Sequence, residues 1–247
     1  MIVTLITDFG TVDGYVGEIK GVLLSRAPGV TIVDVTHDVP PQDVESARLT
    51  LARVWRRFPA GTVHLVVVDP GVGSSRAALA VESDDHRFVG PDNGVLSSGL
   101  LVPGARAIAL SVPAHAAPTF HGRDVFAPAA AALVMGAALS DLGREAYAPA
   151  VRRTPEPARR ADGTLEGEVI AIDRFGNAMT NLAAVHGGTV RIGDTVLVVS
   201  QTYIDVAAGS AIAVIGSSGF IEIAVRDGSA ARALGLHRGT RVSLRPA

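Results

Sequence analysis

Short apolar runs alternate with helical patterns through the first 150 residues, and this alternation limits the possible folds more than any other feature. Residues 2–7 form a β-branched run and residues 63–68 an apolar run, both typical of strands buried on both faces. Residues 15–26 and 44–58 instead repeat their apolar residues at helical spacing. Strands separated by helices predict an α/β domain with a largely parallel sheet flanked by helices. Further strands are expected at 30–35, 77–82, 87–90 and 106–109, and a further helix at 126–135.

The pattern changes after residue 150. The stretch VRRTPEPARRADGTLEG, which begins at Val151, contains two prolines, two glycines and many charges but no apolar periodicity. Such a stretch is typical of a linker, which we place at 151–166, between a domain at 1–150 and a second domain at 167–247. The second domain has short apolar runs separated by Gly or Asp turns, which predicts a small all-β barrel or sandwich. Its strands are expected at 167–172, 189–192, 195–199, 211–215, 220–225 and 241–244.

Composition excludes several classes of protein. With 48% hydrophobic and 19% charged residues the chain is expected to be globular, and a net charge of −2 without a basic tract indicates no nucleic-acid partner. The chain has no cysteine, which excludes disulfides, thiolate catalysis and Cys-ligated zinc. No apolar run reaches the roughly 18 residues that span a membrane, and the first residues are typical of a buried strand rather than a signal peptide. We therefore expect a cytoplasmic protein without a membrane segment.

Acidic residues stand at or just past the ends of four expected strands. Asp8, Asp38, Asp69 and Asp92 each follow an apolar run, and ligands of parallel α/β sheets bind beyond the carboxyl ends of the strands. Each residue alone is equally compatible with a turn, since Asp69 begins Asp-Pro-Gly and Asp92 begins Asp-Asn-Gly. Several carboxylates on one edge of a sheet favour a ligand site.

Other polar features have plain structural interpretations. Gly71 and Gly73 suggest a phosphate loop, but the third glycine of the dinucleotide fingerprint and a Walker lysine are missing. A lone histidine such as His121 is usually a hydrogen-bonded structural residue. The segment Asp173–Asn177 is typical of a turn between strands, and the arginines near residues 152–160 are typical of a solvated linker. These features therefore indicate function only in combination.

Six motifs occur in a fixed order along nearly the whole chain: TDFGTVDGYVGEIKG, VVVDPGVGSSR, GPDNG, FHGRD, IDRFGN and IGSSGF. Together they resemble the S-adenosyl-L-methionine (SAM) hydroxide adenosyltransferases, the hydrolase relatives of fluorinase and chlorinase. The resemblance implies an α/β N-terminal domain and a smaller C-terminal β-barrel domain. It also implies hydrolysis of SAM to adenosine and L-methionine through attack of an activated water on the ribose 5′-carbon. SAM is then the substrate, and no cofactor or metal is expected.

The resemblance assigns roles to single residues. Asp69, Arg76 and His121 match the family's water-activating triad, and we expect them to be catalytic. Contacts to the substrate are implied for ten further positions: Asp8 at the ribose hydroxyls, Asp13 and Tyr15 near the methionine end, Asp173 and Ser217 at the methionine amino and carboxylate groups, Asn177 at the adenine edge, Phe175 and Tyr203 around the base, and Asp92 and Asn93 of the GPDNG motif.

In this family the α/β domain of one subunit faces the β domain of its neighbour, which implies a homotrimer with its active site between subunits. The chain departs from the fluorinase pattern at Gln42, where fluorinase has tryptophan, and at Ser218 and Val225, where it has arginines. We therefore expect the contacts to the methionine carboxylate to differ from those in fluorinase. The triad and the short segment between Gly90 and His121 favour hydrolysis over halogenation.

Three alternatives remain open at the level of sequence. The first is a SAM-dependent 5′-halogenase of the same superfamily. The second is a SAM-binding sensor without turnover, against which the triad argues. The third is a metal-dependent phosphoesterase that would use Asp8, Asp38, Asp69, Asp92 and His121.

Overall fold

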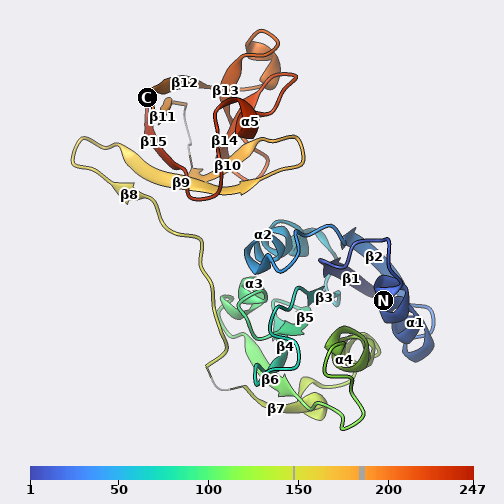
Figure 1. Ribbon diagram of the computed structural model, residues 1–247. Coiled ribbons are helices and arrows are strands. Elements are labelled where there is room, and N and C mark those ends of the chain that lie inside the picture. The colour runs from blue at the N-terminus through green and yellow to red at the C-terminus, as the bar shows by residue number, and fades with distance from the viewer. Residues whose placement is uncertain (147, 184–186) are drawn as a thin grey trace. The chain divides into compact units, whose positions relative to one another are not determined.

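The computed structural model describes residues 1–146, 148–183 and 187–247. The chain divides into two compact units, Met1–Arg153 and Thr154–Ala247 (Figure 1). The predicted order, an α/β region followed by an all-β region, is confirmed.

The N-terminal unit is built on one sheet, which in the described part of the chain has seven strands in the order β2-β1-β3-β5-β4-β6-β7. Strands β2, β1, β3 and β5 are parallel, so their carboxyl ends share one edge. Strand β4 is antiparallel to β5 and β6, and β7 is antiparallel to β6. The strands are β1 (Ile2–Thr7), β2 (Thr31–Thr36), β3 (Val63–Val67), β4 (Ala78–Ser83), β5 (His86–Pro91), β6 (Arg106–Leu110) and β7 (Gly143–Glu145).

Helices cover both faces of this sheet (Figure 1). Helices α1 and α4 contact each other over one face, and α2 and α3 contact each other over the other. Because successive side chains of a strand point to opposite faces, β1 supplies Leu5 to the core beneath α1 and Ile6 to the core beneath α2. The helices are α1 (Tyr15–Arg26), α2 (Val44–Val54), α3 (Ser97–Leu100) and α4 (Ala127–Val134).

Helix α2 ends earlier than the apolar pattern of residues 44–58 predicts. It stops at Val54 and continues as a 3-10 helix, η1 (Trp55–Arg57). Phe58 precedes Pro59, and the residue before a proline is disfavoured in the helical conformation. Phe58 accordingly has an extended backbone, with ψ of 152°.

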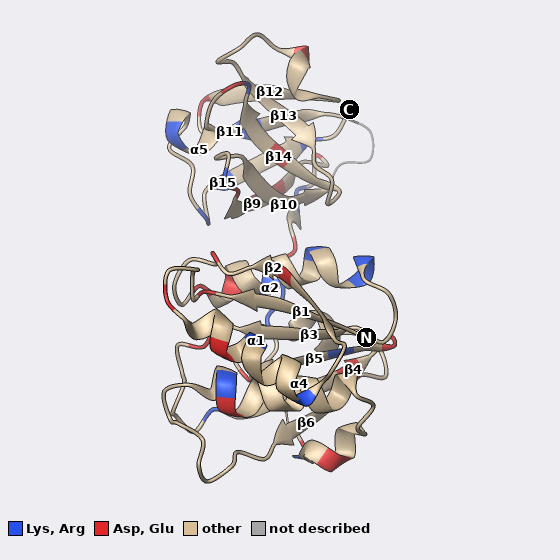
Figure 2. Cartoon of the chain, turned by 90° about the vertical axis from the view of Figure 1, so that its right-hand side faces the viewer, with Lys and Arg blue, Asp and Glu red and all other residues tan. Residues whose placement is uncertain are grey.

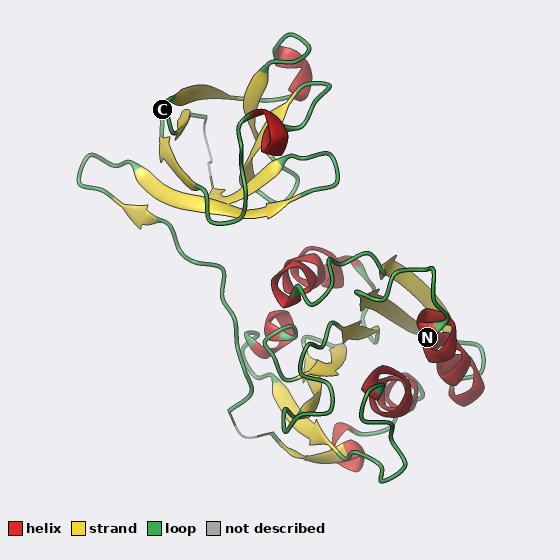
Figure 3. Cartoon of the chain, viewed as in Figure 1, coloured by secondary structure: helices red, strands yellow, loops and turns green. Residues whose placement is uncertain are grey.

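The C-terminal unit is a closed barrel (Figure 3). Among its described residues, seven strands form a ring in the order β10-β14-β13-β12-β11-β15-β9, and the pairing of β9 with β10 closes it. Strand β8 adds to β9 from outside the ring. Closure leaves no open edge within the ring. The elements are β8 (Ala158–Arg159), β9 (Leu165–Ile172), β10 (Ala178–Ala183), β11 (Thr189–Ile192), β12 (Thr195–Ser200), β13 (Ala211–Ile215), β14 (Phe220–Val225), α5 (Ala230–Ala233) and β15 (Arg241–Arg245).

Charged residues of both signs are interspersed over each unit (Figure 2), in keeping with the small net charge of −2. Of the helices that the structure describes, none has the length and apolar character needed to cross a membrane.

Two buried histidines lie side by side beneath η1. His64 is fully buried, its Nδ1 is 2.8 Å from Thr4 Oγ1, and its Nε2 is 3.1 Å from His86 Nδ1. Burial, and to a smaller extent the neighbouring His86, lower the pKa of His64 to about 3 from 6.5. The folded protein therefore holds His64 in its neutral form at neutral pH.

We expect the free energy of unfolding to fall as the pH is lowered from 6.5 toward 3. The unfolded chain takes up a proton at His64 near pH 6.5, whereas the folded chain does so only near pH 3. For one proton the slope approaches about 1.4 kcal/mol per pH unit in this interval and vanishes above it. Urea titrations at several pH values measure this slope. A His64→Phe variant with the same slope as wild type would contradict the assignment.

Candidate active site

The expected site residues of the N-terminal unit gather at the edge where the parallel strands end. Asp8 follows β1, Asp69 lies two residues after β3, and Asp92 follows β5 directly. Because β1, β3 and β5 are parallel neighbours, their ends lie side by side. Strand β4 runs in the opposite direction, so Arg76, two residues before it, lies at the same edge. The topology thus brings together side chains that are far apart in the sequence.

Asp69, Arg76 and His121 form one hydrogen-bonded group. Arg76 Nε donates to Asp69 Oδ1 at 2.9 Å, and Arg76 Nη2 donates to Asp69 Oδ2. The same Nη2 lies 3.1 Å from His121 Nδ1. The Asp69 and Arg76 side chains are only 6% and 10% exposed. A bidentate pair is both strong and directional, so the guanidinium is fixed between the carboxylate and the imidazole.

The guanidinium also sets the proton distribution of His121. Because arginine only donates hydrogen bonds, His121 Nδ1 acts as the acceptor, and the neutral imidazole carries its proton on Nε2. Burial, followed by the positive charge of Arg76, lowers the pKa of His121, against the opposite effect of Asp69 and Asp124. His121 therefore presents a neutral ring whose Nε2 is a hydrogen-bond donor.

Two local features hold His121 against Arg76. Gly73 has a φ of 78°, and a Cβ at this residue would lie 2.8 Å from the carbonyl oxygen of Pro118, so glycine lets the β3–β4 loop approach the segment before His121. After His121 the chain forms a π-helix, η2 (Gly122–Phe126), before α4 begins. The Phe126 ring lies 5.3 Å from the Arg76 guanidinium carbon. The triad is thus supported on the side of the protein core.

Asp8 is held by the loop after β2. Its Oδ2 accepts the backbone N–H of Gln42 at 2.8 Å. Gln42 has a φ of 66°, in the left-handed region. Asp38, which the sequence also places after this strand, is exposed, and its N–H donates to Thr36 Oγ1 at 3.0 Å.

Three aromatic rings, two of them next in sequence to Asp8 and His121, form a cluster. Phe9, Tyr15 and Phe120 contact one another edge to face, with ring centroids 5.2–6.0 Å apart. Phe9 follows Asp8 and Phe120 precedes His121, so the rings connect the two polar parts of the site. Tyr15 remains 48% exposed, and Asp13 is exposed as well.

Asp92 and Asn93 make hydrogen bonds that shape the edge of the sheet. Asp92 Oδ1 accepts the N–H of Ala150 at 2.7 Å. Asn93 Nδ2 donates to the Val68 carbonyl at 2.9 Å, and its Oδ1 accepts the N–H of Val95 at 3.1 Å. The Asn93 amide thus bonds the backbone through both its donor and its acceptor groups.

Four of the five expected residues of the C-terminal unit lie on turns and loops of the barrel, and Tyr203 begins a 3-10 helix, η4 (Tyr203–Asp205). Asp173 Oδ1 accepts the N–H groups of Phe175 and Asn177, at 2.9 and 2.8 Å, and its Oδ2 accepts Asn177 Nδ2 at 3.0 Å. Phe175 is 76% exposed and stands out from this turn. Tyr203 Oη donates to Glu222 Oε2 at 3.2 Å, and Ser217 is exposed. The turn therefore orders Asp173 and Asn177 while presenting Phe175 to its surroundings.

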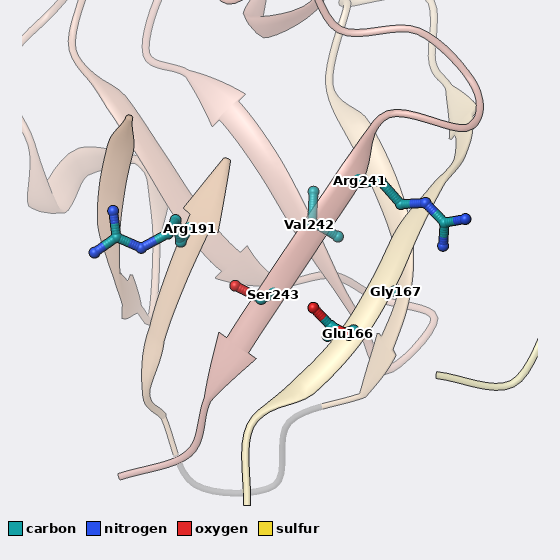
Figure 4. A pocket seen from close by; sticks show the side chains of 6 residues that line it. All are labelled: Glu166, Gly167, Arg191, Arg241, Val242 and Ser243. Atoms are coloured by element: carbon teal, nitrogen blue, oxygen red, sulfur yellow. The ribbon is translucent and has the colours of Figure 1, made fainter. Parts of the chain in front are cut away.

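Two of the hollows in the described part of the chain lie beside the triad and on the barrel. A cavity of about 670 Å3 borders Arg76 and is lined by Ser74, Ser111 and Arg144 among others. A second hollow, of about 450 Å3, lies on the barrel beside β15, where the side chains of Arg191 and Arg241 point to opposite sides (Figure 4). These two cations do not converge on one anion. Within residues 1–146, 148–183 and 187–247, no three His, Asp or Glu side chains are grouped so that they could hold a metal ion.

Known proteins match the chain over nearly its whole length. The family model described as "SAM hydroxide adenosyltransferase N-terminal domain" matches residues 3–143, and that of the corresponding C-terminal domain matches residues 167–243. The (R)-S-adenosyl-L-methionine hydrolase of Thermus thermophilus is 43% identical, with 98% of each chain covered. The protein of the same name from Salinispora tropica is 38% identical, with 97% of this chain and 96% of the relative covered.

Fluorinases match as well, at a lower level. The fluorinase of Nocardia brasiliensis is 29% identical, with 99% of this chain and 96% of that protein covered. Among solved structures, an uncharacterized conserved protein from Thermotoga maritima superimposes with a TM-score of 0.88 at 34% identity, with 99% of each chain covered. The matched domains, the full-length relatives and the fold agree: the chain belongs to the SAM hydroxide adenosyltransferase family.

Proposed function

We propose that the protein hydrolyses SAM to adenosine and L-methionine. The observation that carries the proposal is the buried group in which Arg76 is hydrogen-bonded to both Asp69 and His121. The group contains a carboxylate that can accept a proton and two donors beside it, which is what activation of a water molecule requires. The names of the relatives at 38–43% identity support the same reaction.

In the proposed reaction a water molecule attacks the ribose 5′-carbon while the bond from that carbon to the sulfonium sulfur breaks. Asp69 accepts the proton of the water, and Arg76 and His121 donate hydrogen bonds to the developing hydroxide. The electron pair of the C–S bond stays on sulfur, which leaves as the neutral thioether of methionine. Fixed dipoles thus replace the hydration that the hydroxide loses, and correct placement supplies up to roughly 7–11 kcal/mol.

The substrate contacts are proposed from the matching motifs. Asp8 is an acceptor-only side chain suited to binding two ribose hydroxyls. Its carboxylate is already oriented by the Gln42 N–H, which supports this role. The remaining contacts are Asp13 and Tyr15 at the methionine end, Asp92 and Asn93 at the sheet edge, Asp173 and Ser217 at the amino and carboxylate groups, and Phe175, Asn177 and Tyr203 around adenine.

Reaction in oxygen-18 water is expected to place the label on the 5′-hydroxyl of adenosine and none on methionine. Mass spectrometry of the two products measures the label, since attack at the 5′-carbon joins the water oxygen to the ribose. The same reaction with added fluoride or chloride tests the halogenase alternative. Formation of a halogenated adenosine would identify a halogenase, and unlabelled adenosine would show that water does not attack the 5′-carbon. Either result would contradict the proposed reaction.

We further propose that the protein is a homotrimer in which the α/β domain of one subunit and the barrel of its neighbour complete each site. Support comes from the resemblance to the family and from the two sets of motif residues, one in each unit. Head-to-tail contacts of this kind close into rings. Because the proposed substrate is an intracellular metabolite, we place the reaction in the cytoplasm, which cell fractionation tests.

Mixing two inactive variants is expected to restore part of the activity if sites are shared. An Asp69→Asn chain and an Asn177→Ala chain are combined under conditions that allow subunits to exchange, and product formation is followed. In mixed trimers some sites receive both wild-type halves. If every chain builds its own site, each site keeps one lesion, and activity stays at the level of the separate variants. A fully active monomer would also contradict the assembly.

A further inference from the structure

Four polar side chains form a continuous line of contacts from α1 to the end of β1. Lys20 Nζ donates to Asp34 Oδ2 at 2.5 Å, and His37 Nε2 lies 3.1 Å from Asp34 Oδ1, an ion-pair contact without hydrogen-bond geometry. His37 Nδ1 is in turn 2.8 Å from Thr7 Oγ1. His37 and Thr7 are buried, with 6% and 1% exposure. This line, the Lys20–Asp34–His37–Thr7 network, lies outside the triad and has no part in the proposed substrate contacts.

The contribution to stability alone does not explain the network. The ion pair is partly exposed, with the Lys20 and Asp34 side chains 32% and 41% accessible, and such pairs contribute little to stability. Here β2 is also irregular: Leu5 pairs with Asp34 but Ile6 pairs with Thr36, so Val35 is an extra residue. Bulges of this kind redirect side chains and are common beside active sites. The bulge precedes His37 by two residues, which indicates that the position of His37 itself matters.

The backbone around His37 leads directly to Asp8. The His37 carbonyl accepts the N–H of Gly10 at 2.8 Å, and the N–H of Val39 donates to the Thr7 carbonyl at 3.3 Å. These two bonds tie the loop at residues 37–42 to both sides of Asp8. At the far end of the loop the Gln42 N–H binds Asp8 Oδ2.

The conformation of Gln42 requires such support. Its φ of 66° lies in the left-handed region, which costs an ordinary residue roughly 1–2 kcal/mol. Such conformations persist where the surrounding structure holds them, and they cluster at functional sites. Release of the loop would allow Gln42 to relax and would withdraw its N–H from Asp8.

We propose that the Lys20–Asp34–His37–Thr7 network positions Asp8 for binding of the ribose hydroxyls. It holds the loop at residues 37–42, the loop holds the Gln42 N–H, and that N–H fixes one oxygen of the Asp8 carboxylate. His37 is thus a positioning residue that acts through Asp8. The inference rests on the proposed function, in which Asp8 binds ribose. Its physical effect is preorganisation, which raises affinity by lowering the cost of ordering on binding.

A double-mutant cycle tests this inference. The dissociation constant of adenosine is measured by calorimetry for wild type, His37→Phe, Asp8→Ala and the double variant. We expect His37→Phe alone to weaken binding about tenfold, or about 1.4 kcal/mol, and to change it less than twofold when Asp8 is already alanine. Residues that act through one another show such non-additivity, whereas independent residues add. Equal effects of His37→Phe in both backgrounds would overturn the proposal.

His64 supplies a matched control because it makes the equivalent contact to the same strand. Its Nδ1 lies 2.8 Å from Thr4 of β1, just as His37 Nδ1 lies 2.8 Å from Thr7 of β1. His64→Phe is expected to leave the affinity for adenosine unchanged. His37→Asn, whose amide can replace one ring nitrogen toward Thr7, is expected to regain part of the affinity. Lys20→Met, which changes a partly exposed residue at the outer end of the network, is expected to weaken binding in the same direction without loss of folding.

Hydrogen exchange separates this inference from the proposed function because it needs no ligand. The Gln42 amide is expected to exchange at least about tenfold faster in His37→Phe than in wild type, and at the wild-type rate in His64→Phe. If the wild-type protein binds neither adenosine nor SAM, the proposed function fails, and the exchange rate decides whether His37 holds the loop. Unchanged exchange at Gln42 in His37→Phe and Lys20→Met would overturn the network's role.

Discussion

Asp69→Asn is expected to lower the turnover number for SAM hydrolysis by about 10²–10⁴-fold, the range usual for loss of a general base. Asparagine keeps the shape of aspartate but has no charge and cannot take a proton from water. The Michaelis constant is expected to change much less, because Asp69 is proposed to contact the attacking water and not the bound substrate. Initial rates across a range of SAM concentrations separate the two parameters.

A matched control comes from the other end of the same sheet. Asp84→Asn is the same chemical change in the turn between β4 and β5, where the residue is exposed and has a φ of 53° that asparagine tolerates well. Its turnover number is expected to equal that of wild type. If Asp69→Asn stays within threefold of wild type while adenosine still forms, the proton acceptor is a different group.

Arg76→Met is expected to lower the free energy of unfolding by about 3–5 kcal/mol, the usual cost of removing one partner of a buried ion pair. The reason is that Asp69 is only 6% exposed, so its charge would be left without a partner. His121 Nδ1 loses its donor at the same time. Chemical denaturation measures the loss, and the turnover number is expected to fall with it.

The double variant Asp69→Leu with Arg76→Met separates stability from activity. With both charges replaced by apolar side chains, no buried charge remains unpaired, and we expect most of the lost stability to return. Activity is expected to stay absent. A double variant no more stable than Arg76→Met alone would show that the stability loss has a different origin, such as poor packing against Phe126.

The sequence predicts the strands whose apolar pattern is nearly continuous. It misses a strand whose buried polar residues depend on partners distant in the sequence. The runs that form β1, β3, β13 and β14 are recognisable because each is mostly apolar, with few polar residues. Strand β10 contains Thr180 and Asn181, both buried, whose side chains bond the backbone at Ile221 and Pro155. Their burial depends on partners that are distant in the sequence, so local polarity gives no sign of a strand there.

The candidate site residues divide in the same way, into those that local sequence predicts and those that only the fold brings together. Asp8, Asp69 and Asp92 could be found from their places after strands, because the topology of parallel sheets gathers such residues. The grouping of Arg76 with His121 rests at the level of sequence on the resemblance, since no spacing rule relates residues 45 apart. Lys20 lies within the first of the six motifs, but neither it nor Asp34 is given a role at the level of sequence. They lie on α1 and β2 as ordinary surface charges would, and only the fold brings them to His37.

The π-helix after His121 sets the direction in which the His121 side chain leaves the helix. Five residues of wider turn, Gly122–Phe126, stand between His121 and the regular α4, and such turns arise where a helix contains one residue more than its α-helical register needs. Each residue of an α-helix rotates the chain by about 100°. We expect a chain shortened by one residue in this segment to rotate His121 relative to α4 and so to displace it from Arg76. A single insertion or deletion is therefore expected to change how the imidazole meets the guanidinium, so small length changes in this segment offer a route by which the chemistry of a common scaffold can diverge.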